Sequence, residues 1–126
     1  MDFALPGQLR GPECRRVVTQ AVELRRALEP WFQTLSDERV RKLTVVLRVD
    51  GSLGSFGSPG VENIELVGGD LSCDLVVSDP RWETLNDREI RENLRTRVLK
   101  AIDICFRYAG VVYMQVDLER LAVEGV

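Results

Sequence analysis

Histidine is absent from this sequence of 126 residues, and only three cysteines are present. Histidine is the usual general acid or base near neutral pH and the commonest metal ligand. Its absence excludes Ser-His catalysis, Cys-His catalysis and histidine-based metal sites within the sequence. The cysteines, at positions 14, 73 and 105, lie far apart and form no CxxC pair. We therefore expect no catalytic residue, no metal site and no cofactor, and hence a protein that is not an enzyme.

Long apolar runs are also missing. No window approaches the roughly 18 to 20 apolar residues that cross a bilayer. The first residues, Met1 to Pro6, lack the basic region and apolar stretch of a signal peptide. Cys73 and Cys105 sit in apolar patterns, where free cysteine behaves as a small hydrophobic residue. We expect a cytoplasmic protein that does not enter a membrane.

Positive charge is in deficit, with 17 Lys and Arg against 20 Asp and Glu and a formal net charge of −3. This balance argues against a general binder of nucleic acid or anionic membranes. The remaining composition, 44% hydrophobic and 29% charged, is typical of a globular domain that buries its own core. The length favours one domain over residues 1–126, and no repeat or interdomain linker interrupts it.

The strongest helical pattern covers residues 87–109. Asn86 is a good N-cap, Glu89 stands where a capping-box acid belongs, and Gly110 is a natural stop. Apolar residues recur at spacings of three and four at Ile90, Leu94, Val98, Ala101, Ile102 and Cys105. This pattern predicts a helix over 87–109 with one buried stripe.

A second helical pattern covers residues 12–28 and follows a segment with little pattern. Pro12 suits a first helical turn, and Pro30 is unfavourable in a helix interior, although Trp31, Phe32 and Leu35 could continue the apolar surface after a kink. The apolar residues at helical spacing are Val17, Val18, Ala21, Leu24 and Leu28. Residues 1–11 contain two Pro/Gly breaks, and we expect them to form a flexible N-terminal tail.

Four segments predict strands: 43–49, 61–67, 71–78 and 111–116. The first alternates apolar and polar residues, as a half-buried strand does. Gly68-Gly69-Asp70 supplies a tight turn that joins the second and third segments as a hairpin. The candidates for inward-facing side chains are Leu43, Val45, Leu47, Val49, Ile64, Leu66, Leu71, Cys73, Leu75 and Val77.

The predicted element order is helix, three strands, helix, strand (α-β-β-β-α-β), which indicates an α+β fold. A mostly antiparallel sheet of about four strands, with the two main helices packed on one face, would bury every apolar stripe. The last residues, 117–125, are either a short helix or a loose tail.

Residues 51–60 form a loop rich in glycine and serine, in which a regular element is not expected. The Gly-Lys-Ser/Thr ending of a P-loop is missing, because Gly60 is followed by Val61 and Glu62. We interpret the loop as a connection between strands. Its apolar residues, Leu53 and Phe56, either fold back onto the core or contact a partner.

Acidic residues gather over the predicted hairpin and just beyond it, at Glu62, Glu65, Asp70, Asp74, Asp79 and Glu83, with only Arg81 among them. If the apolar neighbours of Glu65 and Asp74 point inward, both carboxylates stand on the solvent side of one hairpin. Three interpretations remain open: a solvated sheet face that discourages aggregation, a docking surface for a basic protein, and a carboxylate pair for hydrolysis. No companion base supports the last.

Other charged and aromatic features favour structural roles. Arg88, Arg91 and Arg95 share a helix face that could receive RNA phosphates, but interleaved acids can pair with them. We expect no nucleic-acid partner. Trp31 and Trp82 adjoin proline or apolar residues and are interpreted as core residues, with interface anchors as the alternative.

The strand 43–49 with its Asp50-Gly51 end, the acidic hairpin 61–78, the Trp82 segment and the helix 87–109 together resemble small α+β immunity proteins of bacterial polymorphic-toxin systems. The resemblance is one of size, pattern and charge, so no family residue is carried over. Such proteins bind and block a cognate toxin, often with an acidic surface against a basic nuclease site. The resemblance implies that role for this chain.

The function that we predict is a non-enzymatic protein-binding domain, an immunity protein or inhibitor that neutralises a basic toxin partner. Glu65, Asp70 and Asp74 would steer and dock that partner, with Leu53 and Phe56 as anchors. One alternative is a structural or assembly subunit that acts as a homodimer. Another is a small-ligand domain closed by the mobile loop 51–60.

Overall fold

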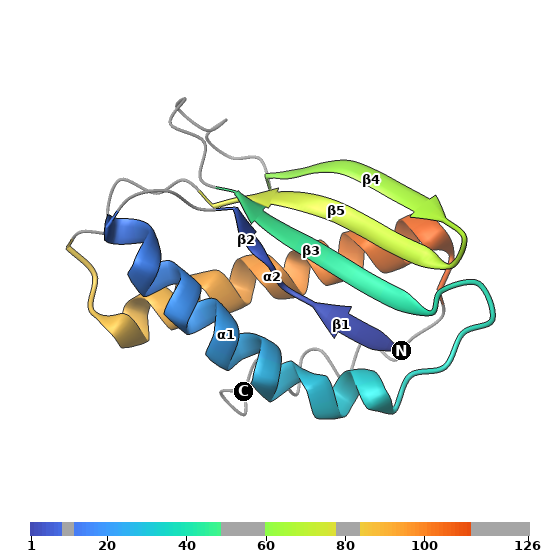
Figure 1. Cartoon of the computed structure of the whole chain (residues 1–126), viewed down its shortest axis with the longest axis horizontal. Helices are drawn as coiled ribbons and strands as arrows, with labels where there is room; N and C mark the ends of the chain where they lie inside the picture. Colours follow the sequence, from blue (N-terminus) through green and yellow to red (C-terminus); the bar gives the residue numbers. More distant parts are fainter. Residues whose placement is uncertain (9–11, 49–59, 78–83, 112–126) are drawn as a thin grey trace.

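Two helices pack against a mixed sheet in the computed structural model, which describes residues 1–8, 12–48, 60–77 and 84–111 (Figure 1). The helices are α1 (Pro12–Gln33) and α2 (Asp87–Ala109). The strands are β1 (Asp2–Ala4), β2 (Gly7–Gln8), β3 (Lys42–Arg48), β4 (Val61–Val67) and β5 (Asp70–Val76). Buried side chains of the strands and of both helices form one cluster. The predicted α+β fold with two main helices is therefore confirmed.

The sheet order is β1-β3-β5-β4, with β2 also pairing with β3. Strands β1, β2 and β5 run parallel to β3, and only the β4–β5 hairpin is antiparallel. The predicted mostly antiparallel sheet is therefore corrected to a mixed one. One reason is that α1 connects β2 to β3 as a crossover, which joins parallel strands.

The two strands of the hairpin differ in burial. Leu71, Cys73 and Leu75 of β5 are fully buried, whereas Ile64 and Leu66 of β4 remain partly exposed. The buried strand β5 takes the central position between β3 and β4, and β4 lies at the edge of the sheet. Two glycines in the left-handed region join the strands, Gly68 at φ 59° and Gly69 at φ 89°, as predicted for a tight turn.

The prediction of a flexible tail over residues 1–11 is wrong for residues 2–8, which carry β1 and β2. Phe3 is buried and its ring stacks on that of Phe32 with a centroid distance of 4.2 Å. The amino group of Met1 donates a hydrogen bond to the carbonyl oxygen of Leu35 at 2.9 Å. The apolar pair Phe3 and Leu5 is too short a pattern to indicate a strand from the sequence alone.

Helix α1 continues five residues beyond its predicted end and contains Pro30. Proline in a helix interior removes one hydrogen bond and costs about 3 kcal/mol. The helix continues because Trp31 and Phe32, directly after the proline, are buried in an aromatic cluster with Phe106. Burying such side chains contributes about 1.5–3 kcal/mol each, which offsets the cost. Trp31 is thus a core residue, as predicted.

Helix α2 has the predicted bounds because its end signals are local. The side-chain oxygen of Asn86 accepts a hydrogen bond from the backbone N–H of Glu89 at 2.9 Å, and the Glu89 carboxylate accepts one from the Asn86 N–H at 3.1 Å. Gly110 ends the helix in the left-handed region with φ 69°. Neither described helix has an apolar window long enough to span a membrane.

Several predictions concern residues that lie outside the described ranges. The predicted strand 111–116 is described only at Val111, which is buried, and the segment 117–125 is not described. Trp82 and the loop residues 51–59 also lie outside them.

Replacing Phe3 by alanine should lower the free energy of unfolding by about 3 kcal/mol, because it removes a buried ring that stacks on Phe32. Urea unfolding measures this loss. The matched control is Val22→Ala on the exposed side of α1, which should change stability by less than about 0.5 kcal/mol. Equal stability of Phe3→Ala and the native chain would mean that the N-terminal segment is a tail after all.

Candidate docking face

One face of the sheet points away from both helices, and we call it the outer face. Along β3 and β5, residues alternate between fully buried and partly exposed. Leu43, Val45 and Leu47 of β3 point to the helices, so their neighbours point the other way. The outer face comprises Asp2, Ala4, Lys42, Thr44, Val46, Arg48, Glu62, Glu65, Val67, Asp70, Ser72, Asp74 and Val76. Within the described residues, no helix or strand covers this face (Figure 1).

Acidic side chains dominate the outer face. Its carboxylates are those of Asp2, Glu62, Glu65, Asp70 and Asp74, and its described cations are Lys42 and Arg48. Small residues lie between the charged ones. Thr44 of β3 is paired with Ala4 of β1 on one side and with Ser72 of β5 on the other. The outer face therefore carries excess negative charge among small residues and valines, of which Val67 is highly exposed.

Arg48 holds two of these carboxylates in place. Its guanidinium donates to Oε2 of Glu62 at 3.0 Å and lies 3.4 Å from Oδ2 of Asp74. The side-chain amide of Asn63 donates to the same oxygen of Asp74 at 2.8 Å. Asn63 adopts φ 53° where the β4–β5 register shifts, and this β-bulge brings its amide to Asp74.

The three acidic residues predicted to dock a partner share the outer face but differ in their surroundings. Glu65 lies opposite Ser72, and Asp70 and Asp74 alternate with Ser72 along β5, so all three point to the same side. Glu65 and Asp70 are exposed, and within the described residues neither carboxylate has an ion pair or hydrogen bond. Asp74 is only 23% exposed and is bound by Arg48 and Asn63.

The predicted anchors, Leu53 and Phe56, lie outside the described residues. Conversely, sequence reasoning did not assign a role to Arg48, Glu62 or Asn63. The alternation of apolar and polar residues in β3 already indicates that Arg48 points away from the apolar face, and this pattern could have identified it as a residue of the outer face. Its contact with Asp74 depends on the parallel pairing of β3 with β5, which no local pattern indicates.

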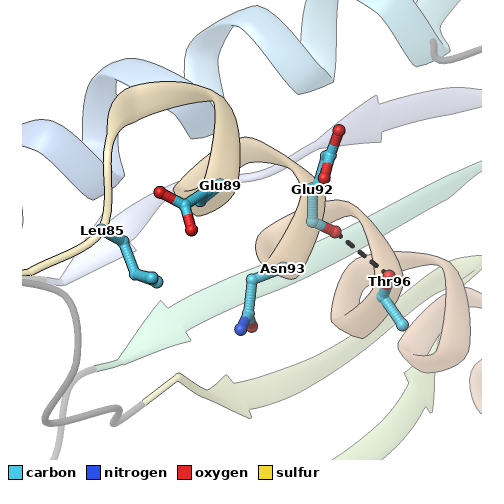
Figure 2. Close-up of a pocket in the computed structure, with 5 residues that line it drawn as sticks. All are labelled: Leu85, Glu89, Glu92, Asn93 and Thr96. Atoms are coloured by element: carbon cyan, nitrogen blue, oxygen red, sulfur yellow. Dashed lines mark hydrogen bonds between the residues drawn. The ribbon is translucent and has the colours of Figure 1, made fainter.

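A depression of about 340 Å³ on α2 is lined by Leu85, Glu89, Glu92, Asn93 and Thr96 (Figure 2). Most of its polar groups already have partners within the helix. Glu89 caps the helix, Glu92 pairs with Arg88 at 3.3 Å, and the Thr96 hydroxyl donates to the Glu92 carbonyl oxygen. The lining residues that the structure describes do not provide the convergent free polar groups of a ligand site.

Cys73 and Cys105 are buried between β5 and α2. The hydrogen bond between the two thiols and their burial raise the pKa of Cys73, so its thiol stays protonated at neutral pH. The side chain of Cys14 lies outside the described set. In the described part of the chain, no group of three or more Cys, Asp or Glu side chains is arranged to hold a metal ion.

Comparison with models of protein families, with curated proteins and with solved structures found no match to this chain. The resemblance to immunity proteins therefore stays a prediction based on size, pattern and charge. Inference about function rests on the geometry of the outer face.

The buried thiols should be inert in the native protein. In a Cys14→Ser variant, the thiol reagent DTNB should not react until urea unfolds the chain, because the reaction requires an accessible thiolate. Absorbance of the released thiolate measures this reaction. Rapid labelling of the native variant would contradict the burial of both residues.

Proposed function

We propose that this chain is a non-enzymatic binding protein whose outer face docks a basic protein partner, and more specifically that it is an immunity protein or inhibitor that neutralises a basic toxin. The observation that carries this proposal is a helix-free sheet face with five carboxylates and two cations among its described residues. A surface with such an excess of negative charge attracts basic proteins and raises their association rate.

The charges of the outer face divide into two groups with different roles. Glu65 and Asp70 are exposed and free of described partners, so a cation from another protein can approach them directly. Glu62 and Asp74 are held by Arg48, which fixes their geometry before a partner arrives. Arg48 therefore offsets part of the negative charge of Glu62 and Asp74, and among the described residues the unpaired negative charge of the face is concentrated at Glu65 and Asp70.

The alternatives have less support from the described residues. A homodimer formed through two outer faces would bring like charges together, which opposes association. Trp31 is buried in the core and cannot anchor such a dimer. The depression on α2 gives little support to a small-ligand domain, because its carboxylates are engaged within the helix.

Reversing charge at Glu65 and Asp70 should weaken partner binding at least about tenfold at low salt and reduce its salt dependence, because the free carboxylates would become cations. The partner is captured from the native host with the tagged chain at low salt, eluted at high salt and identified by mass spectrometry. Its affinity for Glu65→Lys/Asp70→Lys is then compared with that for the native chain by titration calorimetry.

The matched control is Glu23→Lys/Glu38→Lys, which makes the same change in net charge at exposed positions away from the outer face. Its affinity should fall much less than that of the outer-face variant. Equal losses in both variants would show that only net charge matters, and unchanged affinity of the outer-face variant would refute the assigned site.

Replacing Arg48 by methionine should have the opposite effect. Arg48 pairs with Glu62 and Asp74 and offsets one of their two negative charges, so its removal makes both carboxylates available to the partner's cations. We expect the affinity for the basic partner to rise about two- to fivefold at low salt, in line with the energy of a surface ion pair. Weaker binding by a variant that is still folded would show that Arg48 contacts the partner itself.

A further inference from the structure

We propose that the partner binds by adding an extended basic strand to the outer edge of β4, which no described strand pairs with. This inference rests on the proposed function, and it names the binding mode and the chemistry of the partner segment. Strand addition occurs where a sheet edge presents unpaired backbone N–H and C=O groups to another chain. The edge of β4 is the better of the two edges of this sheet.

The two edges differ in length and in accessibility. At one edge, β1 and β2 contain three and two residues, Pro6 interrupts them, and the amino group of Met1 is bound to the end of α1. At the other edge, β4 has seven residues and pairs with β5 on one side only, as far as the described chain shows. Figure 1 shows β4 at the rim of the sheet, on the side remote from α1.

The β-bulge limits which part of β4 can pair. The register with β5 shifts between Glu62 and Glu65, where Asn63 is in the left-handed region. Beyond the bulge, Glu65, Leu66 and Val67 pair regularly with β5. A partner strand would therefore bind beside residues 64–67, the part of the edge that remains extended.

The side chains of this segment define the sequence pattern of the partner. Glu65 and the exposed Val67 point to the outer face, and Ile64 and Leu66 point to the helix side, where they pack partly exposed against the core. A strand beside them places alternate residues on the two sides. Lysine or arginine would lie next to Glu65, and valine or isoleucine would cover Ile64 and Leu66. The partner segment should thus alternate basic and apolar residues.

The same charges oppose pairing with a second copy of this chain. The strand β4 reads Val-Glu-Asn-Ile-Glu-Leu-Val and contains no lysine or arginine. Two such edges side by side would bring glutamates together, and adjacent like charges destabilise a strand pair. A basic strand replaces this repulsion with cross-strand pairs worth about 0.2–1 kcal/mol each. The edge therefore selects a basic partner over itself.

The test uses the full chain and a short, end-blocked peptide of alternating lysine and valine. Binding should slow hydrogen exchange of the edge-facing backbone amides within residues 64–67 by about tenfold or more, because these alternate groups are the ones that do not bond to β5. A matched peptide with N-methyl groups on its internal backbone nitrogens keeps the charges and side chains but cannot donate to a strand. It should bind at least about tenfold more weakly and give no protection of β4.

A second arm exchanges the charges. The variant Glu65→Lys should lose the lysine peptide and bind a glutamate-valine peptide instead, because the cross-strand pair beside residue 65 is re-formed with opposite signs. A lysine peptide that leaves β4 amides unprotected, or that binds as well when N-methylated, would overturn strand addition.

The outcomes separate the two proposals. Loss of partner binding in Glu65→Lys/Asp70→Lys, combined with unprotected β4 amides, would support docking on the outer face and reject the edge. Unchanged partner binding in that variant would instead reject the proposed function.

Discussion

The structure depends on the burial of one face of β3 and β5 against the two helices. Leu43, Leu47, Leu71 and Leu75 are fully buried at this contact, together with the apolar stripe of α2. Each such side chain contributes about 1.5–3 kcal/mol, so the contact decides which way the strands face. Because side chains alternate along a strand, every polar residue of β3 and β5 is then directed to the opposite face.

This constraint explains why charged side chains gather on the outer face, but it does not determine which of them form ion pairs. Lys42 and Arg48 alternate with the buried leucines of β3, and Asp70 and Asp74 alternate with those of β5. Parallel pairing places Asp74 near Arg48, and the bulge in β4 adds Asn63 and Glu62 to the same group. In one part of the face, Arg48 offsets part of the charge of Glu62 and Asp74, and Glu65 and Asp70 are left for contact with other molecules.

The parts of the fold that could be predicted are those with local signals. The capping residues Asn86 and Glu89 and the stop at Gly110 placed α2 correctly, and alternation identified β3 and the solvent side of the hairpin. The parts that could not be predicted depend on contacts between distant residues. Phe3, for example, lies in a strand whose position depends on the stacking of its ring against that of Phe32, 29 residues away in the sequence.

The strand order of the sheet and the ion pairs of the outer face also depend on contacts between residues that are distant in the sequence. Nothing in the hairpin sequence states that β5 rather than β4 neighbours β3, since this follows from competition for the core. Asp74 was correctly placed on the solvent side, but its neutralisation requires Arg48, far away in the sequence. Local patterns therefore predicted which residues reach the outer face, and tertiary pairing decided which of them are free.

The most direct test of the central claim is hydrogen–deuterium exchange of the chain with and without its basic partner. The account predicts protection in β4 and in the neighbouring strands β5 and β3, with α1 and the exposed side of α2 unchanged. Protection confined to the helices would contradict it, because the partner would then bind on the opposite side of the molecule from the outer face.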